Sequence, residues 1–217
     1  MPADSPAAIV LGTCNLKKGR EIALLLAPPW EAHPRLSRLV ARTLDEWPDL
    51  PDVVEDAETF AGNARKKASE TARALGLWTL ADDSGLAVDA LAGAPGVYSA
   101  RYAGTHGDDE ANNRLVLERT ADIPDDLRGA AFVCALALAD PAGTVRLESE
   151  GSCRGRLTRE PRGPGGFGYD PLFLIPEYHR TFGELSPLVK AQLSHRSRAF
   201  ARLRPGLDRL IASGEFS

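Results

Sequence analysis

The order of strand-like and helix-like segments constrains the fold of this chain more than any other feature of its sequence. A short apolar run at 8–11, a helical pattern at 19–27, a second helical pattern at 59–75 and an apolar run at 78–81 come first. Strand patterns then cluster, at 130–139, 144–152 and 172–175. Alternation followed by clustering is typical of a mixed α/β sheet rather than of a purely parallel one. The predicted fold class is therefore α/β, with helices flanking a mixed sheet.

Residues with strong positional preferences mark where several helices begin and end. Thr59 can cap a helix that runs to about Leu75 and is closed by Gly76. Ser186 and Pro187 start another helix, with the serine as its cap and the proline in its first turn. These signals fix helix boundaries that apolar periodicity alone leaves open.

Other segments are predicted by turn and loop signals. Asp140 to Gly143 joins two strands as a hairpin, and Ser194 can cap a final helix that reaches about Ser213. A helical pattern covers 110–119, and the glycine-containing stretch 92–107 is predicted to be loop. The segment 28–58, rich in Pro, Asp and Glu, follows a double proline and allows a strand or a short helix near Leu39.

Length and composition set broad limits on function. A chain of 217 residues, 43% hydrophobic and 26% charged, suits one large domain or two small lobes, and we treat 1–217 as one domain. The net charge of −4 argues against a nucleic-acid coat, which usually carries a basic excess, but leaves a mononucleotide ligand open. No apolar run approaches the ~20 residues of a membrane helix, and the first eight residues lack a signal-peptide pattern. We therefore expect neither a nucleic-acid nor a membrane partner.

The cysteines indicate a reducing compartment. Cys14, Cys134 and Cys153 are odd in number, widely spaced and form no CxxC pair. A disulfide framework or a zinc site is therefore not expected. The expected location is the cytoplasm.

A polar loop after the first strand is a candidate phosphate site. Gly12 to Lys18 links the apolar run to the start of a helix, where free backbone N–H groups and the Lys18 ammonium favour anions. The GxxxxGK[ST] pattern of a Walker A loop is absent. A solvated lysine turn is the competing interpretation of this segment.

The helix that follows Thr59 carries a second polar pair. Asn63 and Lys67 are four residues apart and therefore share one helical face. An amide and an ammonium on one face could hold phosphate oxygens, although an ordinary solvated face is the simpler interpretation of this segment alone.

Two adjacent carboxylates give the strongest local signal. Asp82 and Asp83 follow the apolar run 78–81 and repel each other, which a divalent cation would offset. Magnesium favours one or two carboxylates together with substrate phosphates, and Glu55 lies upstream as a further acidic candidate. The alternative is an Asp-Ser-Gly turn with hydrogen-bonding side chains.

A glycine-rich stretch from Gly163 to Asp170 formally matches GxGxxG. A dinucleotide-binding loop needs a preceding strand and a following helix, whereas here Pro171 and an apolar strand follow, so we reject that interpretation. Glycines instead let backbone approach a ligand, and the Phe167 ring could stack on a base. A core phenylalanine beside a turn is the alternative.

Cationic residues gather near the last two helix starts. Lys190, His195 and Arg196 lie within seven positions and form a donor-rich patch. A lone histidine is usually a surface or core residue, so the cluster matters more than any one member.

Six segments in this order resemble the inosine triphosphate pyrophosphatase (Ham1-like) family, from about Ile9 to Leu210. The pieces are Thr13-x-Asn15-x-x-Lys18, Phe60-x-x-Asn63-Ala64, Ala81 to Leu86, Gly93 to Arg101, Gly165 to Pro171, and Ser194-His195-Arg196. One such piece is weak, whereas six in register are specific. The resemblance implies a two-lobed α/β fold with a mixed twisted sheet, an active site in the cleft between lobes, Mg²⁺ as cofactor and a homodimer.

The resemblance also implies residue roles. Asp83 resembles the general base, with Asp82 and Lys67 as its catalytic neighbours, and Asp83 and Glu55 resemble the metal-side carboxylates. The residues that resemble substrate contacts are Thr13, Asn15, Lys18, Asn63, Ser84, Phe167, Gly168, Tyr169, Asp170, Lys190, His195 and Arg196.

Three departures from the family pattern affect local detail. Cys14 stands where the family often has glycine, and Leu188-Val189 stand where acidic residues are common. The stretch between Pro28 and Glu46 is longer than is typical, so Glu55 is assigned by its distance from Phe60.

The implied activity is hydrolysis of ITP, dITP and XTP to the monophosphate and pyrophosphate, which cleanses the nucleotide pool. A non-catalytic nucleotide sensor is one alternative, which the Asp82-Asp83 pair disfavours. A pyrophosphatase for other modified nucleotides is another, and only a substrate panel distinguishes it.

Overall fold

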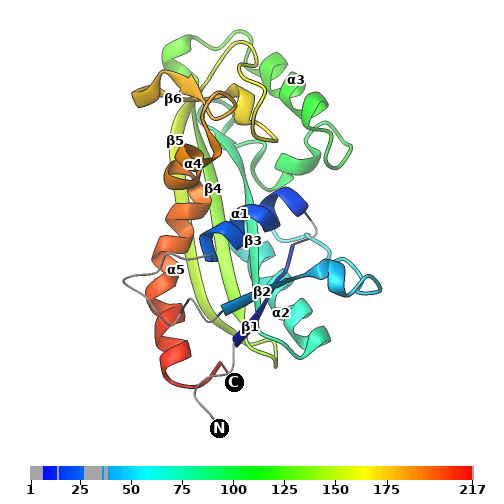
Figure 1. Ribbon diagram of the computed structural model, residues 1–217. Helices are drawn as coiled ribbons and strands as arrows, with labels where there is room; N and C mark the ends of the chain where they lie inside the picture. The colour runs from blue at the N-terminus through cyan, green and yellow to red at the C-terminus, as the bar shows by residue number, and fades with distance from the viewer. Residues whose placement is uncertain (1–6, 14, 27–35, 37–38, 217) are drawn as a thin grey trace. The chain divides into compact units, whose positions relative to one another are not determined.

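A seven-stranded mixed sheet organises the chain in the computed structural model, which describes residues 7–13, 15–26, 36 and 39–216 (Figure 1). The strand order is β2-β1-β3-β4-β5-β6-β7. β1 pairs in parallel with β2 and β3, whereas β6 pairs antiparallel with β5 and β7. The predicted mixed α/β class is therefore confirmed. The strands are β1 Ala7–Leu11, β2 Leu39–Thr43, β3 Thr79–Val88, β4 Gly129–Ala139, β5 Val145–Leu157, β6 Phe173–Ile175 and β7 Arg180–Thr181.

Two compact units share these strands. The first comprises 1–83, 135–150 and 199–217, and the second comprises 84–134 and 151–198. The α-helices are α1 Leu16–Leu26, α2 Phe60–Leu75, α3 Asp109–Arg119, α4 Pro187–Leu193 and α5 His195–Ala212. Each unit is described by itself below.

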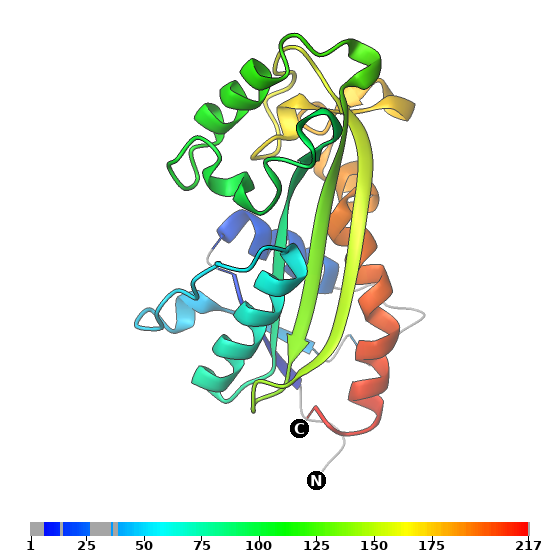
Figure 2. The ribbon, with the colours of Figure 1, turned by 180° about the vertical axis from the view of Figure 1, so that it is seen from behind.

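In the first unit, helices cover both faces of the sheet. α1 and the later turns of α5 lie on one face, and α2 lies on the other, as the two opposite views show (Figures 1 and 2). α2 packs through small side chains, because the cluster beneath it consists of Ala64, Ala68 and Ala72 from the helix and Ala81, Ala135, Ala137 and Ala139 from the strands. Successive strand residues point to opposite faces, so odd-numbered positions of β3 face α2.

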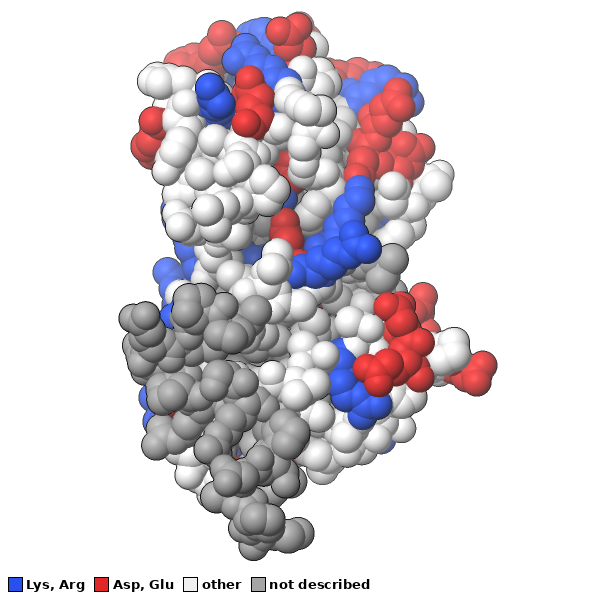
Figure 3. Space-filling model, viewed as in Figure 1, with Lys and Arg blue, Asp and Glu red and all other residues white. Residues whose placement is uncertain are grey.

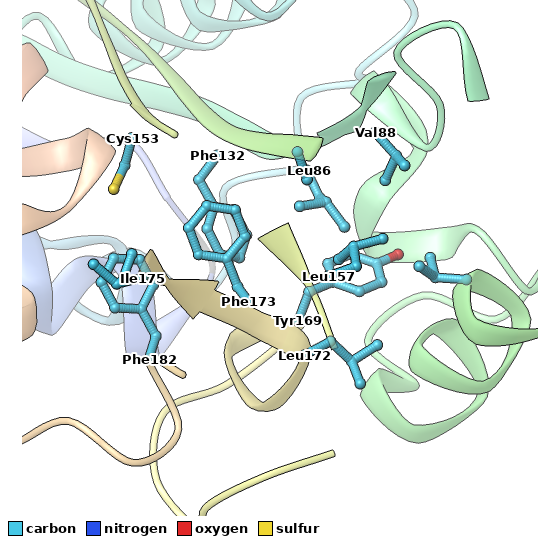
Figure 4. Packing of buried hydrophobic residues seen from close by; sticks show 12 residues of the cluster. Leu86, Val88, Phe132, Cys153, Leu157, Tyr169, Leu172, Phe173, Ile175 and Phe182 are labelled. Atoms are coloured by element: carbon cyan, nitrogen blue, oxygen red, sulfur yellow. The ribbon is translucent and has the colours of Figure 1, made fainter. Parts of the chain in front are cut away.

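The second unit is built on aromatic and branched side chains (Figure 4). The ring centroids of Phe132 and Phe173 are 4.5 Å apart, and those of Phe173 and Phe182 are 5.4 Å apart. Such ring pairs add specific geometry to the area that they bury. This core supports the glycine-rich loop that precedes β6.

The cap residues behave as their types predict. The Thr59 hydroxyl accepts from the Gly62 N–H at the start of α2, and Gly76 ends that helix at φ +64°. Ser186 likewise caps α4. The Ser194 hydroxyl accepts from the Ser197 N–H in the first turn of α5.

The first helix begins three residues before its predicted start at Gly19. The Asn15 side-chain oxygen accepts from the N–H groups of Lys17 and Lys18 at 3.0 and 3.1 Å, which caps the helix at Leu16. The Gly19 start was predicted from apolar periodicity, which does not report an asparagine cap. Cys14, Ala27 and the Pro28-Pro29 pair lie outside the described residues.

The prediction that the third strand ends at Ala81 is wrong. β3 continues to Val88, so Asp82, Asp83 and Ser84 lie within a buried strand and do not form an Asp-Ser-Gly turn. β1 pairs with this strand only at Thr79 and Leu80, and β4 is its neighbour on the other side. Gly85 is needed there because a Cβ would lie 2.2 Å from the Ser99 Oγ and 2.7 Å from the Gly96 oxygen.

The other boundaries differ in smaller ways. β5 runs to Leu157 rather than to Ser152, and the predicted loop 92–107 includes a 3₁₀ helix at Gly96–Arg101. The Asp140 turn forms as predicted, since Gly143 N donates to Asp140 O at 2.7 Å. The segment near Leu39 is a strand.

The surface charge and the hydropathy of the helices add little information beyond the fold itself. On the face shown in Figure 3, acidic and basic side chains are interspersed with uncharged ones. Among the described residues, no helix combines the length and the apolar character that a membrane span requires.

Candidate active site

A cluster of carboxylates and lysines lies in the first unit, where α2 faces β3. Asp83 is buried, and its Oδ2 accepts from Asn63 Nδ2 at 3.0 Å. Lys67 Nζ lies one turn further along α2, 2.7 Å from Glu55 Oε1 and 3.9 Å from Asp83 Oδ1. The predicted shared face of Asn63 and Lys67 is therefore confirmed, and it meets carboxylates inside the unit rather than solvent.

Burial and the neighbouring charges have opposite effects on the pKa values of Asp83 and Lys67. Burial raises the pKa of the Asp83 carboxyl above its ordinary value, against the opposing pull of Lys67 and Lys18. The Lys67 ammonium is itself desolvated, yet Asp82, Asp83 and Glu55 together raise its pKa. Lys67 therefore stays protonated, while Asp83 holds a proton more readily than an exposed aspartate does.

Asp82 faces the opposite side of the strand from Asp83. It is buried, and its Oδ2 lies 3.9 Å from Lys18 Nζ on α1. α1 and α2 cover opposite faces of the sheet in this unit (Figures 1 and 2). The adjacent carboxylates thus meet two different helices, and each has a lysine near it.

The loop before α1 leads from β1 into a helix start that Asn15 caps. Gly12 N donates to Leu80 O at 2.8 Å, which ties the loop to β3. The Thr13 hydroxyl accepts from Asn15 N at 3.3 Å, and Asn15 caps the helix. Because Lys18 is largely buried near Asp82, the solvated-turn interpretation does not describe this lysine.

The donor set of the first unit suits a hard cation. Oxygen atoms of Glu55 and Asp83 already share one cation, the Lys67 ammonium. Among the described residues, no three His, Cys, Asp or Glu side chains form a metal cage. Magnesium normally keeps waters and substrate phosphates as its remaining ligands, so two carboxylates fit it and a full cage is not required.

The second unit holds a different polar cluster next to its aromatic core. Lys190 is buried, and its Nζ donates to Asp170 Oδ2 at 2.6 Å. The same ammonium lies 4.4 Å from the centre of the Phe167 ring. Phe167 is only partly buried, so the alternative of a core phenylalanine is wrong.

Arg196 and His195 complete this cluster from the first turn of α5. The Arg196 guanidinium donates to Ser84 Oγ at 2.7 Å and lies 5.5 Å from the Phe167 ring centre. The His195 ring stacks on Phe132, with centroids 4.9 Å apart and planes 15° apart. The structure therefore brings Lys190 and Arg196 to the Phe167 ring, whereas His195 packs on Phe132 of β4.

The glycine-rich loop is anchored on several sides. Gly165 N donates to Gly183 O at 2.9 Å, and Phe167 N donates to Asp170 Oδ2 at 2.8 Å. The Tyr169 hydroxyl donates to Ser99 O at 2.8 Å, and burial raises the pKa of Tyr169, which keeps it a donor.

Sequence reasoning missed two residues that hold this loop. On α3, the Asp109 carboxylate accepts from the Gly168 N–H, and the Asn113 amide donates to the Gly168 carbonyl. Their spacing of four places them on one helical face, but nothing in the sequence shows what that face meets.

Comparison with known proteins gives consistent matches over nearly the whole chain. The family model described as Ham1 family matches residues 9–206. A dITP/XTP pyrophosphatase of Rhodopirellula baltica is 56% identical over 209 residues, which is 96% of this chain and 97% of that protein. The dITP/XTP pyrophosphatase of Desulforamulus reducens is 47% identical over 207 residues, 95% of this chain and 98% of that protein. A solved HAM1 protein from Coxiella burnetii aligns with a TM-score of 0.80 at 38% identity, covering 93% of this chain and 98% of that one.

Proposed function

The chain belongs to the Ham1 family, and from this we propose that it hydrolyses inosine- and xanthosine-type nucleoside triphosphates to the monophosphate and pyrophosphate. The names of two relatives that it matches over nearly their full lengths support this substrate class. The observation that carries the chemistry is the buried Asp83 carboxylate held beside Lys67 and Asn63.

Asp83 has the surroundings of a general base. A base works best when its pKa lies closer to the working pH, and burial moves Asp83 in that direction. In the proposed step, a water molecule gives its proton to Asp83 as its oxygen bonds to phosphorus. The bond between the α- and β-phosphates breaks, and pyrophosphate leaves with the electron pair of that bond.

Lysines and a helix start provide the charge for the phosphates. Lys18 and the positive end of the α1 dipole provide positive charge, and Thr13 and Asn15 add polar side chains. Lys67 keeps its ammonium next to Asp83, where it stabilises negative charge that develops during the reaction.

Glu55 and Asp83 would hold the Mg²⁺ that we propose as cofactor. When bound, the metal offsets the charge of the phosphates. Glu55 and Asp83, which pair with Lys67, would then contact a second cation as well. This fits a cluster in which three carboxylates act on a single lysine.

The second unit would recognise the base. Lys190 and Arg196 supply only hydrogen-bond donors, and Phe167 supplies an aromatic face. A 6-oxo group on hypoxanthine or xanthine accepts such bonds, whereas the 6-amino group of adenine leaves them unpaired. A site built on such bonds can reject the mismatched analogue by ~10⁴-fold or more.

A pyrophosphate-release panel tests this function. ITP, XTP, dITP, GTP and ATP would be compared with and without Mg²⁺, and we expect Mg²⁺-dependent release that is fast for the first three and slow for ATP. Nucleotide binding without release would support a sensor, and release confined to other modified nucleotides would support the third alternative.

We also propose a cytoplasmic homodimer, since family members are usually dimers and Cys134 and Cys153, the two cysteines that the structure describes, form no disulfide. Light scattering on the purified chain measures its mass in solution. A monomeric mass near 23.3 kDa would contradict the dimer.

A further inference from the structure

One residue of the glycine-rich loop, Gly168, is held at both its backbone N–H and its backbone carbonyl by a single helix. The Gly168 N–H donates to Asp109 Oδ2 at 2.9 Å, and the Gly168 carbonyl accepts from Asn113 Nδ2 at 2.9 Å. Both side chains come from the first two turns of α3. No residue of this helix belongs to the substrate contacts proposed above.

Helix α3 does not need Asp109 for its own cap. Asp108 fills that role, because its Oδ1 accepts from Ala111 N at 2.9 Å. Asp109 is the next residue, and its carboxylate is directed to another segment 59 positions away. The helix start therefore carries two adjacent aspartates with separate tasks.

Gly168 is one of the positions at which the loop backbone could rotate. Its φ is +59°, in the left-handed region where glycine is least restrained. Phe167 lies directly before it, and the anchored Tyr169 directly after it. Fixing both peptide groups of Gly168 therefore fixes the direction in which the Phe167 ring points.

We propose that Asp109 and Asn113 are positioning residues that set the selectivity of this enzyme for the purine base. The Phe167 ring has Lys190 Nζ at 4.4 Å and the Arg196 guanidinium at 5.5 Å, so its orientation decides where a stacked base meets those donors. If the purine base is free to tilt, its 6-oxo group no longer meets the Lys190 and Arg196 donors in the right geometry. Discrimination against ATP then falls more than phosphate binding does.

This proposal rests on the proposed function, and its test separates the two. The kcat and KM for ITP and for ATP would be measured for Asn113→Ala, Asn113→Asp, Asp109→Ala and Asp109→Asn. Inhibition by inorganic tripolyphosphate reports on phosphate binding alone. Asp108→Ala is the matched control, because it weakens the start of α3 without removing a bond to Gly168.

The expected changes follow from the hydrogen bonds. The ITP-to-ATP ratio of kcat/KM falls about 5-fold for Asn113→Ala and for Asp109→Ala, as the loss of one hydrogen bond predicts. Asn113→Asp lowers it further, since a carboxylate then faces the Gly168 carbonyl. Asp109→Asn restores most of the ratio, because an amide oxygen can still accept. Tripolyphosphate inhibition stays the same in all four.

Three outcomes would overturn the proposal. The first is an unchanged ratio in the folded Asn113→Asp protein. The second is an equal loss in Asp108→Ala, which would assign the effect to helix stability. The third is a parallel loss of tripolyphosphate binding. A wild-type chain that releases no pyrophosphate from any nucleotide would instead refute the proposed function itself.

Discussion

The two units carry polar clusters made from similar residue types in opposite proportions. In the first, Glu55 and Asp83 lie beside Lys67, and these two carboxylates together with Asp82 raise its pKa. In the second, one carboxylate, Asp170, serves the Lys190 ammonium, and the Arg196 guanidinium lies beside the same ring as Lys190. The first cluster therefore has acidic capacity for a metal, and the second has donor capacity for a neutral, acceptor-bearing ring.

The comparison indicates that charged side chains can be buried where a bound ligand supplies the opposite charge or the missing hydrogen-bond acceptors. A buried hydrogen bond between side chains holds each cluster, from Asn63 to Asp83 in the first and from Lys190 to Asp170 in the second. The predictions below change one cluster at a time.

The largest effect is expected from Asp83→Asn in the acidic cluster. Loss of a general base typically lowers the rate by ~10²–10⁴-fold, and this change also weakens metal binding. Steady-state pyrophosphate release at saturating Mg²⁺ measures it. Asp56→Asn is the control, because the Asp56 carboxylate also pairs with a lysine of α2, Lys66, at 2.6 Å, but is exposed. Near-normal turnover in a folded Asp83→Asn protein would refute the assignment.

Arg196→Ala tests the donor-rich cluster and should act on selectivity. Removing a charged donor costs about 1.5–3 kcal/mol, or ~10- to 100-fold, in kcat/KM for ITP. The loss for ATP should be smaller, so the gap between the substrates narrows. Arg198→Ala on the same helix is the control, since its exposed guanidinium binds Ser152 O. Equal loss for both substrates would indicate that Arg196 binds phosphate instead.

The stability of the acidic cluster should depend on pH in a definite direction. Burial raises the folded-state pKa of Asp83 above its ordinary value of 3.8, so ionisation of this carboxyl destabilises the fold. That cost is absent below 3.8, develops as the pH rises from 3.8 toward the raised pKa, and is complete above the raised pKa. Asp83→Asn should therefore melt a few degrees higher than wild type at neutral pH.

Melting curves at several pH values without Mg²⁺ check this prediction. The difference between Asp83→Asn and wild type should shrink as the pH is lowered toward 3.8. The exposed Asp56 offers the opposite case, because the Lys66 hydrogen bond lowers its pKa. A lower melting temperature for Asp83→Asn at neutral pH would show that its attraction to Lys67 outweighs desolvation.

The smallest effect is expected at Cys14, which lies outside the described residues. Its thiol has no neighbouring His or second Cys in the sequence to mark a nucleophile, so Cys14→Gly should keep ITP hydrolysis near the wild-type rate. Pyrophosphate release from the purified variant measures this. Complete loss of activity would mean that the loop depends on the thiol.

Local chemistry made much of this molecule predictable. Thr59, Gly76 and Ser186 act through bonds to residues close in sequence, and each occupies its expected place. The shared face of Asn63 and Lys67 follows from helical geometry alone.

Features that depend on distant partners were not predictable. β3 extends through Asp83 beside β4, beyond its pairing with β1 at Thr79 and Leu80, and no local signal reports where such pairing continues. The contact of Asn113 with Gly168 joins residues 55 positions apart. Propensity describes an element, whereas its neighbours decide how far it runs and what it touches.

The placement of Asp82 and Asp83 within a strand also predicts which mutations this gene can tolerate. A strand shows alternate residues to its two faces, so inserting or deleting one codon upstream in β3 would turn Asp82 toward Asn63 and Asp83 toward α1. Both aspartates would still be present, but Asp82 rather than Asp83 would face Lys67. Point substitutions in β3 should therefore outnumber length changes by far in functional libraries, while the exposed turn at Pro141-Ala142 should accept both.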